Sequence, residues 1–180
     1  HNPTRFISLA RISKEKGTLK MLQAFKTIDT PVVLDLYGPI YDTAYWNLCQ
    51  QVIKILPKCI EATYKGIAKS QEVPKILREY DFFMMLSEGE NFGHAILEAF
   101  SAGAPVIISN KTPWTGLQEK NIGWDIDINN SNKVGQVVKK ACQISSKGYK
   151  QMSKSANGFA RDFCTSKNLT DQNKQLFDTF

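Results

Sequence analysis

The feature that most constrains this 180-residue chain is an alternation of short, continuous apolar runs with segments of helical spacing. We predict strands at the apolar runs, which are 6–10, 32–37, 62–64, 82–86 and 106–108. Helical spacing is found between these runs, over 19–25, 41–56, 73–77 and 92–102. Strands that are apolar without alternation are typical of a parallel sheet covered by helices on both faces. The sequence therefore predicts an α/β fold, a Rossmann-like doubly wound parallel sheet.

The length and composition fit one domain, residues 1–180. A chain of 180 residues can bury one good core but is short for two. Hydrophobic residues at 42% and charged residues at 22% are ordinary for a soluble globular protein. After Trp124 the pattern becomes purely helical, so we expect a helical C-terminal tail over about 130–180. A strand pattern follows His1 almost at once, and we expect an N-terminal domain to precede this chain in the intact protein.

The net charge of +6 is concentrated in residues 131–180, which hold 9 Lys and Arg against 3 Asp and Glu. This segment is either a pair of solvated helices or a basic surface that meets anionic lipid or another polyanion. No apolar run approaches the roughly 20 residues of a membrane span. We expect a cytoplasmic protein, peripheral at the inner membrane face if the basic segment binds lipid. Nucleic acid is a disfavoured partner because basic and aromatic residues do not interleave.

The cysteines and histidines argue against a metal centre. The four cysteines are scattered without a C-x-x-C pair, which suits reduced thiols rather than a disulfide framework or a zinc site. The two histidines are too few for a His-rich metal site. We expect neither a metal nor a cofactor.

The densest polar signal is the segment 87–98, which begins at a predicted strand end and runs into a predicted helix. Free N–H groups at such a helix start suit a phosphate, and Gly93 lets a ligand approach the backbone. Farther along, His94 and Glu98 are four residues apart and share one polar edge. Glu98 either meets ligand hydroxyl groups there or is an ordinary surface glutamate.

A second signal lies in the loop after the first predicted strand. Arg11 can hold phosphate oxygens through two hydrogen bonds, and Lys16 adds a point charge. A cation at a helix start is unfavourable for the helix dipole, so an anionic ligand would explain Lys16. The alternative is that both are solvated loop cations.

Paired carboxylates would suggest a glycosidase, but the spacing argues against one. At ~1.5 Å per helical residue, Glu90 and Glu98 should be about 10 Å or more apart, whereas retaining glycosidases need about 5–5.5 Å. Glu88 and Glu90 lie on one loop and cannot easily flank a bond.

As a set, these segments resemble the C-terminal, sugar-nucleotide-binding domain of glycosyltransferase family 4, whose members have the two-domain GT-B architecture. The family's Glu-x7-Glu pattern is matched by Glu90 and Glu98. Further family stretches, namely Gly-Arg-x4-Lys-Gly, Leu-Glu-Ala-x-Ala-x-Gly-x-Pro-Val and the loop beneath the nucleobase, are met at 10–17, 97–106 and 64–66. The likeness covers about residues 5–127.

The resemblance implies roles for individual residues. Arg11 and Lys16 would neutralise the diphosphate, and Glu90 would contact the donated sugar near its reacting carbon; these are the catalytic candidates. Glu98 would bind the ribose hydroxyls. Substrate contacts are implied for Asn91, Phe92, Gly93, His94, Ala95, Glu98, Gly66 and Ile67.

The sequence also departs from the family pattern. The family's Gly-Phe-Gly is Asn-Phe-Gly at 91–93, and its Gly-Arg is Ala10-Arg11. Where many relatives have a Gly-Gly loop, this chain has Asn-Lys-Thr-Pro-Trp at 110–114. Trp114 either packs in the core or stacks on a sugar.

The resemblance thus implies a retaining, hexosyltransferase-type enzyme of polysaccharide biosynthesis. This chain would hold the nucleoside diphosphate sugar, and the missing N-terminal domain would hold the acceptor, a glycan, lipid or other molecule. Alone, the chain should bind the sugar nucleotide but turn over little. The alternatives are a sugar-nucleotide epimerase of the same architecture and a non-catalytic nucleotide-sugar-binding module.

Overall fold

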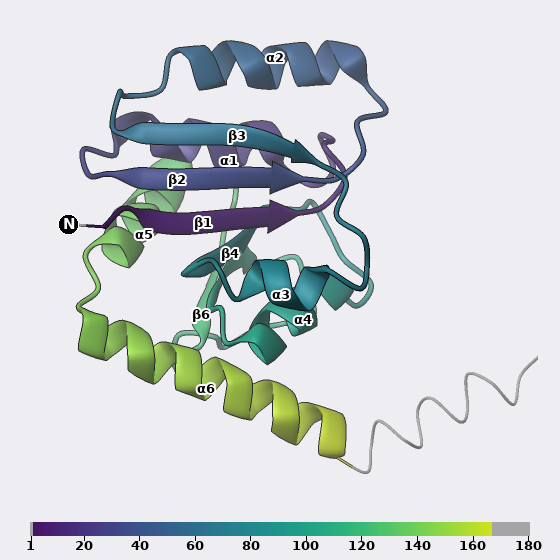
Figure 1. Cartoon of the computed structure of the whole chain (residues 1–180), viewed down its shortest axis with the longest axis vertical. Helices are drawn as coiled ribbons and strands as arrows, with labels where there is room; N and C mark the ends of the chain where they lie inside the picture. Colours follow the sequence, from purple (N-terminus) through teal and green to yellow (C-terminus); the bar gives the residue numbers. More distant parts are fainter. Residues whose placement is uncertain (1, 167–180) are drawn as a thin grey trace, which may run out of the picture.

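The computed structural model describes residues 2–166, and its centre is one six-stranded sheet (Figure 1). Its strands are β1 Thr4–Leu9, β2 Val32–Tyr37, β3 Ile60–Gly66, β4 Phe82–Met85, β5 Val106–Ser109 and β6 Gly123–Ile126. All neighbouring strands run parallel, in the order β3-β2-β1-β4-β5-β6. The doubly wound α/β prediction is confirmed.

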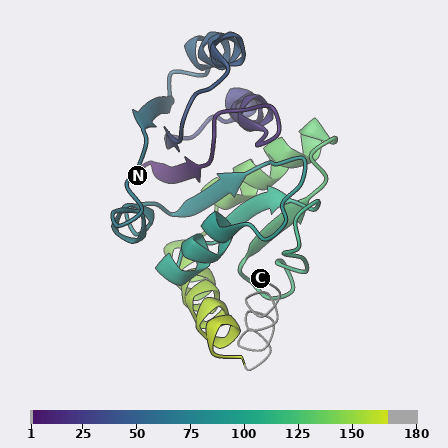
Figure 2. The same ribbon diagram turned by 90° about the vertical axis from the view of Figure 1, so that its right-hand side faces the viewer.

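Helices cover both faces of the sheet. Their bounds are α1 Thr18–Ala24, followed by the 3-10 turn η1 Phe25–Thr27, α2 Thr43–Lys54, α3 Val73–Leu77, α4 His94–Ala102, α5 Ser131–Cys142 and α6 Ser146–Thr165. In the first view, α3 and α4 lie in front of the sheet while α1 and α5 lie behind it (Figure 1). Figure 2 shows the same layers from the side.

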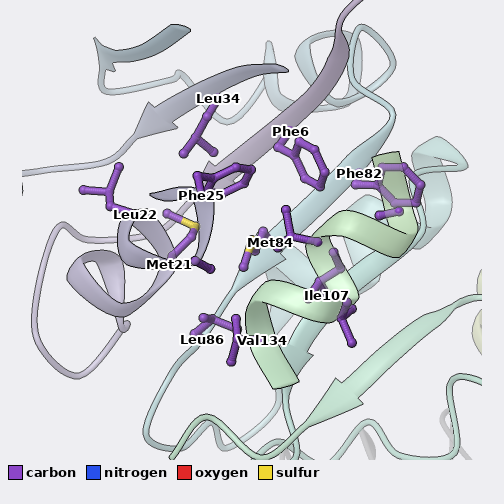
Figure 3. Close-up of a cluster of buried hydrophobic side chains, with 14 of the residues drawn as sticks. Phe6, Met21, Leu22, Phe25, Leu34, Phe82, Met84, Leu86, Ile107 and Val134 are labelled. Atoms are coloured by element: carbon purple, nitrogen blue, oxygen red, sulfur yellow. The ribbon is translucent and has the colours of Figure 1, made fainter. Parts of the chain in front are cut away.

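Two hydrophobic cores result, one on each face of the sheet. Phe6 belongs to the core under α1 and α5, whereas its neighbour Ile7 belongs to the core under α3 and α4. Successive strand side chains alternate in this way because they point to opposite faces. Figure 3 shows the first core, where Phe6, Met21, Leu22, Phe25, Leu34, Phe82, Met84, Leu86, Ile107 and Val134 meet. Burial on both faces explains why the strands have continuous apolar runs.

The prediction of purely helical structure after Trp124 was wrong for the residues that directly follow it. Residues 123–126 form β6, which pairs with β5 in parallel. The segment contains only four residues and includes Asp125, whose carboxylate accepts hydrogen bonds from the N–H groups of Gly116 and Leu117. A strand this short with a glycine and a carboxylate lacks the apolar run that marked the other strands.

The helical tail is confirmed within the described residues, where α5 and α6 account for most of 131–166. The predicted tail also includes 167–180, which lie outside the described residues. Helix α6 joins the two cores, because Met152 packs in the first core while Ala156 and Ala160 pack in the second. Over residues 2–166, no helix combines the length and the apolar character needed to cross a bilayer.

The strand order reverses between β1 and β4, and this reversal positions the site. From β1 the chain builds outward through β2 to β3, then returns to the other side of β1 with β4. In open parallel sheets, ligands bind beyond the carboxyl ends of the strands at such a reversal. The loops that leave β1 and β4 therefore share one crevice edge, and both are loops that the sequence marked.

Candidate functional site

The loops after β1 and β4 are in direct backbone contact. The N–H of Glu88 donates to the carbonyl oxygen of Glu15 at 2.7 Å. Gly17 begins α1 with a φ of +70°, and a Cβ placed there would lie 2.0 Å from the carbonyl oxygen of Leu86. Only glycine allows this approach. The fold thus brings together two segments that are about 70 residues apart in the sequence.

Lys16 and Glu90, two of the predicted catalytic residues, form an ion pair across these loops. Their side chains are 20% and 11% exposed, so the pair is shielded but reachable. An ammonium group has three N–H donors, so Lys16 can hold Glu90 and still donate to an anion.

Glu88 forms a second charged bridge beside this pair. Its carboxylate accepts from Lys20 of α1 at 2.5 Å and from Lys111 of the loop after β5 at 2.7 Å. Hydrogen bonds from Lys111 and Lys20 lower the pKa of Glu88 to about 2. Sequence reasoning missed Lys20, which lies in the first turn of α1, whereas Lys16 precedes the N-cap Gly17.

The start of α4 presents unused backbone donors to the same edge. Gly93 caps this helix with a φ of +80° and offers no side-chain hydrogen bond. Ile96 and Leu97 are the first residues of α4 whose N–H groups donate to the backbone, both to the carbonyl oxygen of Gly93. Within the described residues, the N–H groups of His94 and Ala95 consequently have no acceptor, the usual state of a helix start.

His94 and Glu98 line one pocket of about 220 Å³ in the groove between α3 and α4. Glu98 is exposed and forms no ion pair within residues 2–166. Arg78, which sequence reasoning did not single out, lines the other side of the pocket. The shared polar edge predicted for His94 and Glu98 is therefore present and borders a cavity.

Arg11, the third catalytic candidate, is exposed on the loop after β1. It lies near Glu15, whose pKa is lowered by the backbone N–H of Glu15 and the hydroxyl of Ser13, with a smaller electrostatic contribution from Arg11. No hydrogen bond joins Arg11 to another described residue. Its role toward a diphosphate stays a prediction.

The remaining candidates from the segment 87–98 lie just before α4 or in its first turn. Asn91 is exposed, and Ala95 is half-buried in the first turn of the helix. Phe92 is half-buried, with its ring centroid 4.7 Å from that of His94 and 5.5 Å from that of Trp114.

The predicted base contacts lie at the end of β3. The carbonyl oxygen of Gly66 accepts a hydrogen bond from the N–H of Gly38 at 2.8 Å. Ile67, the next residue, is 69% exposed. Neither residue lines the pocket of Glu98.

Of the two interpretations of Trp114, the structure supports packing in the core. It is 6% exposed and packs among aromatic side chains of α4 and α6. Its indole N–H donates to the carbonyl of Phe92 at 2.5 Å. A stacked sugar would need an open ring face, which this position does not provide.

A metal site is not apparent within residues 2–166, where no group of three or more His, Cys, Asp and Glu side chains converges. The four cysteines are free thiols, as their spacing suggested. Whether the reaction needs a metal stays a prediction. What the edge does offer is cations, carboxylates and free N–H groups, a set able to hold an anion together with hydroxyl groups.

Comparison with known proteins identifies a family whose model matches most of the chain. The family model described as glycosyl transferases group 1 matches residues 1–158. No curated protein matches the chain.

Solved structures share the fold at low sequence identity. The catalytic domain of cholesterol-α-glucosyltransferase from Helicobacter pylori superposes with a TM-score of 0.68 at 20% identity, covering 90% of this chain and 99% of that one. Anabaena HepE, in complex with UDP and glucose, gives 0.80 at 18% identity, covering 99% of this chain and 49% of HepE. A glycosyltransferase from Rickettsia africae gives 0.75 at 20% identity, covering 99% of this chain and 48% of that one. The chain thus spans about half the length of the last two.

Proposed function

The chain belongs to the glycosyl transferases group 1 family, and on that basis we propose that it is the sugar-nucleotide-binding half of a retaining glycosyltransferase. The proposal places it in glycosyltransferase family 4 as the C-terminal domain of a two-domain enzyme. Its substrate would be a nucleoside diphosphate sugar, and a separate N-terminal domain would hold the acceptor.

The observation that carries the proposal is the meeting of Lys16 and Glu90 beside the free N–H groups of α4. A diphosphate needs cations and N–H donors, whereas a sugar needs acceptors for its hydroxyl groups. Both kinds of group lie at one edge of the sheet, at the strand reversal where α/β folds bind ligands.

The nature of the ligand is supported by the complexes of a structural relative. HepE is described in complex with UDP and glucose and with UDP-glucose. We carry that ligand class, a nucleoside diphosphate sugar, to this chain. The pocket of His94 and Glu98 would then receive the ribose, with Glu98 accepting from its hydroxyl groups.

The chemistry follows from where charge develops. As the bond between the sugar and the diphosphate breaks, negative charge collects on the leaving phosphate and positive charge on the sugar ring. Lys16 and Arg11 would stabilise the phosphate, assisted by the N–H groups of His94 and Ala95, because groups placed in advance lower the barrier most. Glu90 would hold a sugar hydroxyl close to the reacting carbon.

Titration of the 180-residue chain tests sugar-nucleotide binding. We expect one of UDP-, GDP- or ADP-glucose to bind with a micromolar to millimolar Kd in calorimetry or NMR. Lys16→Met keeps the length of the side chain and removes its charge, so it should weaken binding about tenfold, the usual effect of losing one charge-assisted hydrogen bond.

The matched control is Lys154→Met, since Lys154 is an exposed lysine on α6. It should bind like the unaltered chain. Equal affinity in all three proteins, or no binding of any of the three sugar nucleotides, contradicts the proposal. Retention is tested with the intact enzyme, where the NMR coupling constant of the product's anomeric proton should match that of the sugar nucleotide.

A further inference from the structure

Trp114 is the part of this edge that neither the proposed chemistry nor the family pattern uses. It stands in the loop after β5, at the end of the stretch Asn-Lys-Thr-Pro-Trp at 110–114. It is buried and reaches across to the loop after β4, where its indole N–H donates to the carbonyl oxygen of Phe92 at 2.5 Å.

The indole is held in place from several sides. Its ring centroid lies 5.0 Å from that of Phe163 and 6.0 Å from that of Phe159, both on α6, and 5.7 Å from that of Phe100 on α4. Its own backbone N–H donates to the hydroxyl of Thr112 at 3.3 Å. Rings packed this closely have few other rotamers, so the N–H has a fixed direction.

The carbonyl that it holds belongs to the peptide unit between Phe92 and Gly93. In a planar trans peptide, the oxygen and the N–H point in opposite directions. Anchoring the oxygen of Phe92 on Trp114 therefore directs the N–H of Gly93 away from the indole. The space beside Gly93 is too small for a side chain, because a Cβ there would lie 3.3 Å from the indole nitrogen and 2.8 Å from Cδ1 of Ile96.

The next two N–H groups along the chain are those of His94 and Ala95, which have no acceptor among the described residues. Gly93, whose left-handed backbone allows many orientations, links these groups to the anchored peptide. The hydrogen bond from Trp114 holds the peptide before Gly93, while the N–H groups of Ile96 and Leu97 hold the peptide after it by donating to the carbonyl oxygen of Gly93.

We propose that Trp114 is a positioning residue, which fixes the Phe92–Gly93 peptide so that the N–H groups at the start of α4 are aimed at the diphosphate of the sugar nucleotide. The inference rests on the proposed function. It assigns to Trp114 an indirect role in binding phosphate and none in contacting the sugar.

The test separates phosphate binding from nucleoside binding. The probes are UDP with uridine, GDP with guanosine and ADP with adenosine, and the pair used is the one whose diphosphate the unaltered chain binds best. Trp114→Phe keeps an aromatic ring but removes the N–H. It should raise the Kd for the nucleoside diphosphate about five- to tenfold while the Kd for the nucleoside stays within twofold, as expected when one or two hydrogen bonds are misdirected.

Trp124→Phe is the matched control. Trp124 is similarly buried, but its indole nitrogen has no hydrogen-bond partner among residues 2–166, and its ring packs in the other core. It should leave both affinities unchanged. If Trp114→Phe does not fold, Trp114 is replaced with benzothienylalanine, which keeps the two-ring outline and lacks the N–H.

The outcomes are distinct. A loss confined to the diphosphate in the Trp114 variant supports the inference. An equal loss for diphosphate and nucleoside shows a merely structural role and overturns it, as does an unchanged diphosphate affinity. If the unaltered chain binds none of the three diphosphates, the proposed function itself fails. Slow solvent exchange of the Trp114 indole proton, compared with that of Trp124, checks the hydrogen bond independently.

Discussion

At the scale of single residues, two carboxylates at the sheet edge form bridges to lysines, whereas Arg11 has no ion pair among the described residues. Glu88 joins α1 to the loop after β5, while Glu90 joins the loops after β1 and β4 through Lys16. Glu88 holds two lysines that are far apart in the chain, and Glu90 holds one that is 74 residues away. Sequence reasoning singled out Lys16 as a cation at a predicted helix start and Glu90 through its resemblance to a family motif. The bridging role of Glu88 depends on Lys20 and Lys111, which only folding brings near it.

The bridge at Glu88 predicts a pH dependence. Its pKa is lowered from 4.5 to about 2, so the ionised form is favoured by folding. The stabilisation from this bridge should be complete above about pH 4.5 and should be lost as the pH falls toward 2. In the double variant Lys20→Met with Lys111→Met, side-chain carbon NMR should show Glu88 titrating near its ordinary pKa. An unchanged low pKa in that variant contradicts the bridge.

At the scale of elements, close approach between loops decides which glycines are indispensable. Gly17 and Gly66 both have left-handed backbone angles, with φ of +70° and +81°. A Cβ on Gly17 would lie 2.0 Å from the carbonyl oxygen of Leu86, whereas a Cβ on Gly66 would have nothing within 4 Å. The start of α1 is thus packed on the end of β4, but the end of β3 is open.

Alanine at these two positions should separate backbone strain from steric overlap. Gly66→Ala should cost about 1–2 kcal/mol, the price of the left-handed conformation. Gly17→Ala should cost the same plus a further 1–3 kcal/mol or so, because α1 must move away from β4. Urea denaturation of the two variants measures the difference. Equal destabilisation would mean that the loops do not touch.

At the scale of the whole molecule, α6 joins the two cores. Figure 1 shows it along the bottom of the molecule, below α3 and α4. Ala156 and Ala160 face the second core with 0% and 2% exposure, and Phe163 reaches Trp114 beside the site. Helix α6 therefore supports the sheet edge on which the sugar nucleotide would bind.

A larger side chain at the α6 contact should loosen this support. Ala156→Leu should destabilise the chain by about 1–3 kcal/mol, since no space is left for the added methyl groups. Lys154→Leu, on an exposed position of the same helix, should stay within about 0.5 kcal/mol of the unaltered chain. Thermal and urea unfolding measure both. A neutral Ala156→Leu would show that α6 is not tightly docked.

The sequence by itself determined which segments form strands and helices, and which short segments are chemically unusual. Val32–Tyr37 was predicted with the bounds that the structure has, and the helix predicted to begin at Val73 does begin there, because apolar runs and spacing are local properties. β6 was missed because its pairing with β5, rather than its own residues, makes it a strand.

Only the tertiary structure decided which of these segments are neighbours. The pairing of β1 with β4 brings Lys16 to Glu90, and the pairing of β4 with β5 brings Trp114 to Phe92. Spacing along the chain does not encode strand order, because the same alternation of strands and helices is compatible with more than one sheet topology. Contacts made by burial and close packing across the sheet select one.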